Sequence, residues 1–104
     1  MQIETQMSET PSGTVDGAVA ALLQMLVQSL VDNQNRVSIT ILRAEQTTIF
    51  EVKVDPEDVR RIIGRKGRTA DAIREILFNL GSKEGRRYVM EIVEPRGRMT
   101  IPVR

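Results

Sequence analysis

The chain has 104 residues, of which 40% are hydrophobic and 28% charged, a composition typical of one soluble globular domain with a modest core. It contains no cysteine and no histidine, which excludes a disulfide framework, a thiolate metal site and the commonest general base of enzymes. The net charge is only +1. Aromatic residues make up 3%, which excludes stacking on aromatic rings as the main mode of nucleic-acid recognition.

Residues 1–14 are polar and show no periodicity, which predicts a disordered N-terminal arm. A helix follows, because apolar residues recur at helical spacing and share one face: Val19, Leu22, Leu23, Leu26 and Leu30. The apolar stretch 18–31 is too short to span a bilayer, and no basic residue precedes it as in a secretory signal. We therefore expect a cytoplasmic protein.

Residues 36–43 and 47–54 alternate apolar and polar side chains, which predicts two strands joined by a hairpin at 44–46. On the second strand, one face carries Phe50, Val52 and Val54. A third strand is predicted at 87–94, with one face formed by Tyr88, Met90 and Ile92. The tail, residues 95–104, is either flexible or adds an edge strand at 99–103.

Two helices are predicted between the second and third strands. Asp55 and Pro56 suit the N-cap and the first position of a short helix, which Gly64 ends. The second helix begins at about Arg68, and we expect Gly81 to end it. Its inward face is formed by Ala70, Ile73, Leu77 and Leu80.

The turn between these helices, Gly64-Arg65-Lys66-Gly67, is the most informative stretch of the chain. Its glycines allow positive φ and let a ligand approach the main chain closely. The free amide groups and positive dipole end of the second helix face the same spot. No acidic residue interrupts residues 60–68, which hold five cations: Arg60, Arg61, Arg65, Lys66 and Arg68. This arrangement favours binding of a phosphate backbone.

A short helix, a GxxG turn and a longer helix between strands resemble the K-homology (KH) domain. The run IIGRKGRTADAIREIL, preceded by VDPEDV and followed by RRYVMEIVE, is similar to the KhpA family of small bacterial KH proteins. The resemblance covers residues 15–94. It implies an α+β, type II KH fold of order α-β-β-α-α-β, with a three-stranded mixed sheet and the helices packed on one face. We therefore expect an arm at 1–14, a KH domain at 15–94 and a tail at 95–104.

The resemblance also implies single-stranded RNA binding of low sequence specificity, by a GxxG loop that clamps the backbone against a hydrophobic groove. It implies that Ile63 and Ala70 line the groove floor. Many KH domains have a larger aliphatic residue at the position of Ala70, so strong base discrimination is not expected. The candidate RNA-binding residues are Arg61, Ile63, Gly64, Arg65, Lys66, Gly67, Arg68 and Ala70.

Other charged residues have simpler interpretations. For Arg60 and Arg61, a solvated side chain and a direct RNA contact are equally good interpretations. Arg74 lies on a different face of its helix from Arg68, where it suits a salt bridge or the surface. The default interpretation of Lys83, Arg86 and Arg87 is a solvated loop. Capping and surface charge account for the acidic residues.

Three functions remain to be compared. The leading one is an RNA chaperone or post-transcriptional regulator. The second is an interaction module, because the resemblance implies self-association into a homodimer and pairing with a larger KH protein of the KhpB, Jag or EloR type. The third, an enzyme, is disfavoured because the chain lacks His, Cys and a credible carboxylate pair. We expect no metal and no cofactor.

Overall fold

The computed structural model describes residues 15–94 and 97–100, so the predicted N-terminal arm and most of the tail lie outside the described residues. The helices and strands are α2 (Val15–Leu30), β1 (Ser38–Arg43), β2 (Thr47–Lys53), α3 (Val59–Ile63), α4 (Arg68–Lys83), β3 (Arg87–Glu94) and β4 (Gly97–Thr100). Three short 3-10 turns connect them: η1 (Gln34–Arg36), η2 (Pro56–Asp58) and η3 (Arg65–Gly67). The order α-β-β-α-α-β through β3 confirms the type II KH prediction.

The sheet has the order β1-β2-β3-β4. β1 and β2 form the predicted antiparallel hairpin, and β2 and β3 pair in parallel, which confirms the mixed three-stranded sheet. β4 pairs antiparallel with β3, from Glu94 opposite Gly97 to Glu91 opposite Thr100. This fourth strand matches the edge-strand alternative for the tail, but it begins two residues earlier than the predicted 99–103.

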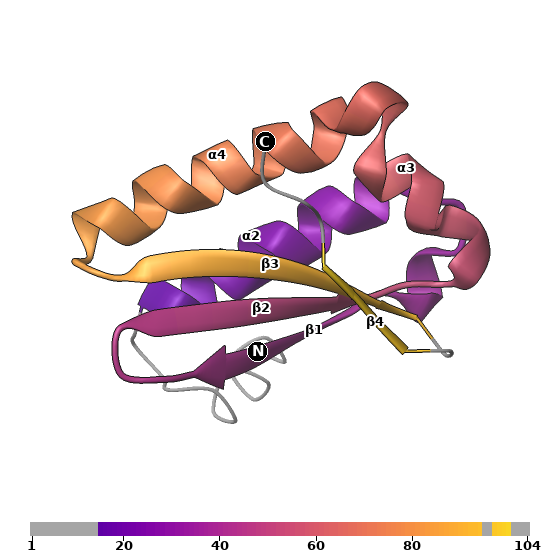
Figure 1. Cartoon of the computed structure of the whole chain (residues 1–104). Helices are drawn as coiled ribbons and strands as arrows, with labels where there is room; N and C mark the ends of the chain where they lie inside the picture. Colours follow the sequence, from indigo (N-terminus) through magenta and orange to yellow (C-terminus); the bar gives the residue numbers. More distant parts are fainter. Residues whose placement is uncertain (1–14, 95–96, 101–104) are drawn as a thin grey trace.

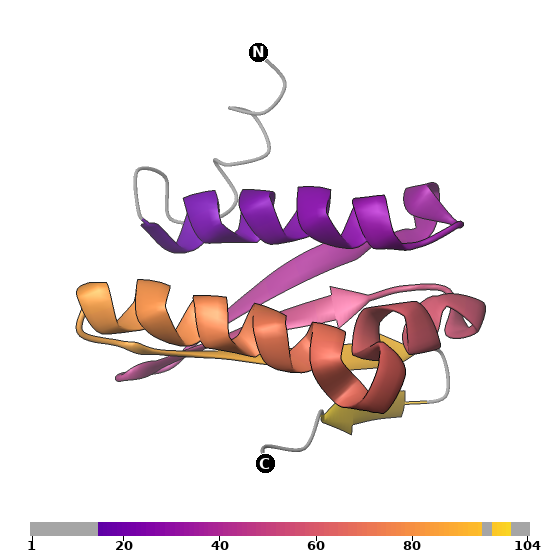
Figure 2. The same ribbon diagram turned by 90° about the horizontal axis from the view of Figure 1, so that it is seen from above.

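The helices all cover the same face of the sheet (Figure 1), and α2 and α4 lie side by side above it (Figure 2). The core forms between these two layers. The sequence grouped the side chains of each strand by face without choosing the inward one, and the structure turns inward the faces whose side chains are at most 4% exposed: Phe50, Val52, Val54, Tyr88, Met90 and Ile92. The rings of Phe50 and Tyr88 meet edge to face, with centroids 5.1 Å apart.

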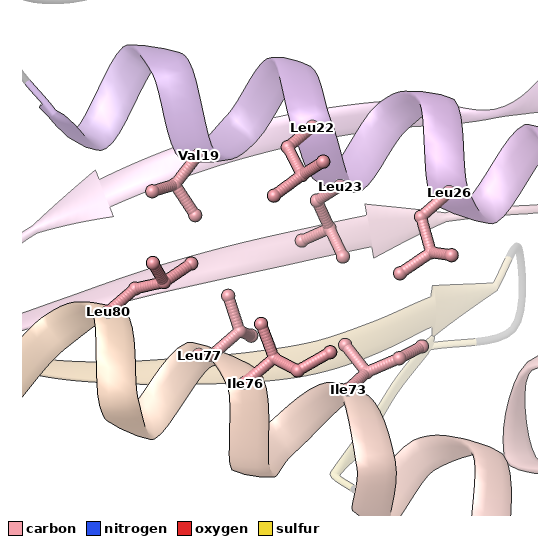
Figure 3. Close-up of a pocket in the computed structure, with 8 residues that line it drawn as sticks. All are labelled: Val19, Leu22, Leu23, Leu26, Ile73, Ile76, Leu77 and Leu80. Carbon is pink, nitrogen blue, oxygen red and sulfur yellow. The ribbon is translucent and has the colours of Figure 1, made fainter.

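The buried face of α2 differs from the prediction at Leu22 and at Val27, which lay outside the predicted stripe. Val19, Leu23 and Val27 are buried against the sheet, whereas Leu22 is 52% exposed. The reason is that Leu22 and Leu26 point toward α4 and not toward the sheet (Figure 3). The apolar stripe of α2 is therefore shared between the sheet and the neighbouring helix.

The prediction that Gly81 ends the long helix was wrong, because α4 continues to Lys83. Gly81 is buried in its last turn, where an added Cβ atom would lie 2.7 Å from the carbonyl oxygen of Arg86. The glycine with positive φ, 71°, that follows this helix is Gly85. Gly81 is thus explained by close packing and not by termination of the helix.

Among the side chains that the structure describes, two acidic ones are buried, which corrects the interpretation of all acids as caps or surface charges. Asp16, in the first turn of α2, accepts hydrogen bonds from the Tyr88 hydroxyl at 2.6 Å and the Thr48 hydroxyl at 3.2 Å, and it pairs with the guanidinium of Arg43. Burial, together with the bond to Asp16 and its charge, raises the pKa of the Tyr88 hydroxyl well above its usual range. This cluster anchors the start of α2 to three strands.

Asp58 anchors the other end of α2. Its carboxylate accepts the side-chain amide of Asn33 at 2.9 Å and the backbone amides of Asn33 and Asp32 at 3.1 and 3.2 Å. Burial alone would raise the pKa of Asp58, but these hydrogen bonds and the nearby charge of Arg61 outweigh it and hold that pKa below its ordinary value. The helix start predicted at Asp55 is confirmed, since its side chain accepts the Glu57 amide at 2.9 Å.

Arg86 was expected in a solvated loop, and the structure corrects this. Its guanidinium donates to the carbonyl oxygens of Ala44, Glu45 and Thr47 at 2.6–3.1 Å and to the Thr48 hydroxyl at 3.0 Å. Arg86 therefore fastens the β1–β2 hairpin to the loop after α4. Lys83 and Arg87 are exposed, as expected.

Candidate nucleic-acid interface

The GxxG turn has a backbone that few sequences can adopt. α3 ends at Ile63, and Gly64 follows with φ 80° and ψ 174°, a region open essentially to glycine alone. Lys66 and Gly67 then lie in the left-handed region, with φ 55° and 76°. Two hydrogen bonds hold the turn, from the Gly64 amide to the Arg60 carbonyl at 2.8 Å and from the Gly67 amide to the Gly64 carbonyl at 3.1 Å.

The turn presents its cations to solvent at the start of the long helix. Arg65, Lys66 and Arg68 are all exposed. The N-cap of α4 is Gly67, which has no side chain to cap the helix. The amide groups of the first turn and the positive dipole end of α4 therefore lie beside these three charges. Such a surface attracts an anion such as a phosphate.

The two expected floor residues differ in exposure. Ile63 is half-buried and packs at the edge of the core, whereas Ala70 is 0% exposed and belongs to the core itself. Ile63 is thus the apolar side chain that remains at the surface beside the loop. Ala70 lies behind that surface, with Ile62 and Ile73 in the same core.

Arg61 does not extend into the loop surface as an unpaired cation. Its guanidinium forms ion pairs with Asp32 at 3.0 Å and with Asp58 at 3.4 Å, and its side chain is 52% exposed. These contacts tie α3 to the end of α2. Arg60 is exposed, and Arg74 forms the predicted salt bridge, with Asp71 at 3.1 Å.

Sequence reasoning did not identify an apolar groove between α2 and α4. Eight side chains from the two helices point toward one another across it (Figure 3): Val19, Leu22, Leu23, Leu26, Ile73, Ile76, Leu77 and Leu80. Two of them remain largely open to solvent, Leu22 at 52% and Ile76 at 49%. The sequence did indicate that α2 has an apolar exposed face. No charged residue occurs between Gly17 and Val31, whereas a helix on a water-facing surface usually carries several.

Within residues 15–94 and 97–100, no group of three acidic, His or Cys side chains is placed to hold a metal ion. None of the helices described in these ranges is long and apolar enough to cross a membrane.

Comparison with known proteins places these features in a family. Residues 20–92 match the family model described as "KhpA/KhpB, KH domain". A relative in Aquifex aeolicus, named RNA-binding protein KhpA, is 39% identical over 77 residues, which cover 74% of this chain and 98% of the relative. Relatives of the same name in Borreliella burgdorferi and Clostridium acetobutylicum are 41% and 42% identical, over 70% and 69% of this chain and 89% and 96% of their own lengths. No solved structure matches the chain.

Proposed function

The chain belongs to the KhpA/KhpB family of KH domains, and from this premise we propose that it binds single-stranded RNA through its GxxG turn. One observation carries the proposal: three exposed cations surround a turn with positive φ at three positions, directly before a helix without a side-chain cap. The name RNA-binding protein KhpA, shared by the relatives, supports the same function. The protein is accordingly a binding module rather than an enzyme.

In this proposal, most of the affinity comes from the RNA backbone. Arg65 and Lys66 neutralise phosphates, Arg68 adds charge in the first turn of α4, and the turn amides other than those of Gly64 and Gly67 donate to phosphate oxygens. Gly64 and Gly67 give the turn its shape, and Ile63 offers an apolar surface to a base or sugar. Arg61 and Ala70 have supporting roles, because the first is held by Asp32 and Asp58 and the second is buried.

A backbone clamp with few aromatic side chains distinguishes bases weakly, so the protein suits a general role on many transcripts. We propose that it acts as an RNA chaperone or post-transcriptional regulator, and the cytoplasm is the compartment that this role implies. Since phosphate contacts release counterions, its affinity falls steeply with rising salt.

The test replaces both cations of the turn, as Arg65→Asp with Lys66→Asp. The matched control is Lys83→Asp with Arg87→Asp, which makes the same change in net charge at two exposed positions outside the turn. Binding is measured by fluorescence anisotropy with a labelled oligouridylate at low salt. We expect the turn variant to lose at least about tenfold in affinity, and the control to lose much less. Wild-type affinity in a folded turn variant contradicts the clamp.

The apolar groove favours a second function, that of an interaction module. We propose that two copies pair through the groove between α2 and α4. A twofold interface sets the same patch against itself, so any net charge on it would repel, and the exposed face of α2 carries no charge between Gly17 and Val31. Pairing would also join two weak RNA sites into one stronger one. A larger KH protein of the KhpB, Jag or EloR type is the alternative occupant.

Oligomeric state tests this second function. Light scattering gives the mass of the wild type, of Ile76→Glu in the groove, and of the control Phe78→Glu. Phe78 is 61% exposed on the same helix but does not line the groove. We expect a dimer for the wild type and the control, and a monomer for Ile76→Glu. A monomeric wild type contradicts self-pairing and leaves the groove to a larger partner, which mixing with that partner would show.

A further inference from the structure

We propose that Thr69 is a positioning residue for RNA binding: its side chain packs on Gly64 and holds the turn in the shape that leaves Gly67 open to the ligand. The inference rests on the proposed RNA-binding function of the turn. It assigns different roles to the two glycines, which the GxxG pattern alone treats as equivalent.

Gly64 is closely covered by the chain itself. A Cβ atom added there would lie 2.2 Å from the Thr69 hydroxyl oxygen, 2.6 Å from the Thr69 Cβ and 2.9 Å from the Thr69 amide nitrogen. Real Cβ atoms essentially never approach other atoms this closely. The space next to Gly64 is therefore filled by Thr69, and no ligand can approach the main chain from that side.

Gly67 has the opposite surroundings. It also has positive φ, 76°, but an added Cβ would meet no atom within 4 Å. Its Cα is open, and the exposed side chains of Lys66 and Arg68 flank it in the sequence. Among the described residues, this is the side of the turn where a phosphate can come close to the main chain.

Thr69 is suited to fixing this asymmetry. It is half-buried in the first turn of α4, directly beside the turn that it covers. Gly64, lacking a side chain, can adopt many backbone conformations, so its single conformation here depends on what packs against it. Removing the Thr69 side chain frees the turn, and RNA binding must then bear the entropic cost of ordering it again.

The test compares Thr69→Ala, which removes the hydroxyl oxygen nearest to Gly64 and the methyl group but keeps Cβ, with Thr69→Val, which keeps the branched shape but lacks the hydroxyl. Each protein is titrated with the labelled oligouridylate over a range of salt concentrations, and a thermal melt checks the fold. We expect Thr69→Ala to bind about tenfold more weakly, as when a charge-assisted hydrogen bond is removed, and Thr69→Val to bind as the wild type does. The slope of log affinity against log salt should stay that of the wild type in Thr69→Ala, because the ordered complex neutralises the same phosphates, so that the loss of affinity and its rescue in Thr69→Val report the ordering of the turn alone.

Other results overturn the inference. Wild-type affinity in Thr69→Ala means that the side chain does not position the turn. Equal loss in Thr69→Ala and Thr69→Val means that the hydroxyl itself contacts RNA. Should Thr69→Ala not fold, Thr69→Gly, which removes the whole side chain, is titrated at lower temperature in its place: weaker binding supports the inference and wild-type affinity overturns it. Failure of the proposed function looks different, because then the Arg65 and Lys66 double variant also binds like the wild type.

Discussion

The hydroxyl of Tyr88 donates a 2.6 Å hydrogen bond to the carboxylate of Asp16, which lies 72 residues earlier in the chain. Both side chains are buried, and the bond joins β3 to the first turn of α2. Asp58 makes the corresponding connection at the other end of α2, through the backbone amides of Asp32 and Asn33. The helix that forms one wall of the apolar groove is thus held at both ends by a buried carboxylate.

The first prediction concerns the Asp16 cluster. Asp16→Ala leaves the hydroxyls of Tyr88 and Thr48 without their acceptor and the charge of Arg43 without its partner, so we expect it to lower the free energy of unfolding by about 3 kcal/mol. Tyr88→Phe removes one donor and keeps the others, which predicts a loss of about 1 kcal/mol. Urea unfolding followed by circular dichroism measures both. The control is Asp32→Ala, an exposed acid whose loss is expected to change stability by less than about 1 kcal/mol.

The second prediction is a pH dependence that comes from Asp58. Its pKa is lower in the folded protein than the ordinary 3.8, so the folded state favours the charged carboxylate. The resulting stabilisation is fully present above the ordinary value and is lost as the pH falls through the lowered pKa. Asp58→Asn does not titrate at this position.

We therefore expect the difference in unfolding free energy between wild type and Asp58→Asn to be largest near neutral pH and to shrink as the pH drops below about 4. Urea denaturation at a series of pH values measures it. The control is Asp55→Asn, which changes an acid on the same short segment. An asparagine at this position can still accept the N-cap hydrogen bond that the Glu57 amide donates. A difference for Asp58→Asn that stays constant over this range argues against the hydrogen-bonded carboxylate as its cause.

Much of this fold follows from local patterns in the sequence. Alternation identified the strands and which side chains share a face, because one face of this sheet packs on helices and the other does not. The turn at Gly64 could be identified because one helical pattern ends there and another begins just after it. Glycine also tolerates the φ of 80° that the structure requires. These features depend only on residues close together in the chain.

Apart from the misplaced end of α4 at Gly81, which depends on nearby Arg86 and Tyr88, the errors share a physical origin, since they depend on residues far apart in the chain. Asp16 resembles a helix-start acid until Tyr88 is placed beside it, and Arg86 resembles a loop cation until the β1–β2 hairpin reaches it. Leu22 fits the apolar stripe of α2, but the sheet covers only part of that stripe. For the candidate site, the charges and glycines of the turn were visible in the sequence, whereas the ion pairs of Arg61 and the groove between α2 and α4 were not.

The third prediction tests the packing at Gly81. An alanine there would bring its Cβ within 2.7 Å of the Arg86 carbonyl oxygen and 3.0 Å of the Tyr88 ring. Although alanine favours helices, we expect Gly81→Ala to lower stability by about 1–3 kcal/mol, because backbone must move to relieve the overlap. Ser82→Ala, at the adjacent exposed position of the same helix, is the control and should be neutral or slightly stabilising. A thermal melt of Gly81→Ala equal to that of the wild type would show that the loop after α4 yields easily.

The fourth prediction separates the shape of the turn from the space in front of it. Gly67 and Gly85 both have positive φ, 76° and 71°, and at both an added Cβ meets nothing within 4 Å. Asparagine tolerates this backbone region better than other residues with side chains, so Gly67→Asn and Gly85→Asn should each fold with a similar, small loss of stability. Only the first places a side chain where the RNA backbone is proposed to approach. We expect Gly67→Asn to bind the labelled oligouridylate at least about tenfold more weakly and Gly85→Asn to bind like the wild type. If the two variants melt alike and also bind alike, the phosphate does not reach the chain at Gly67.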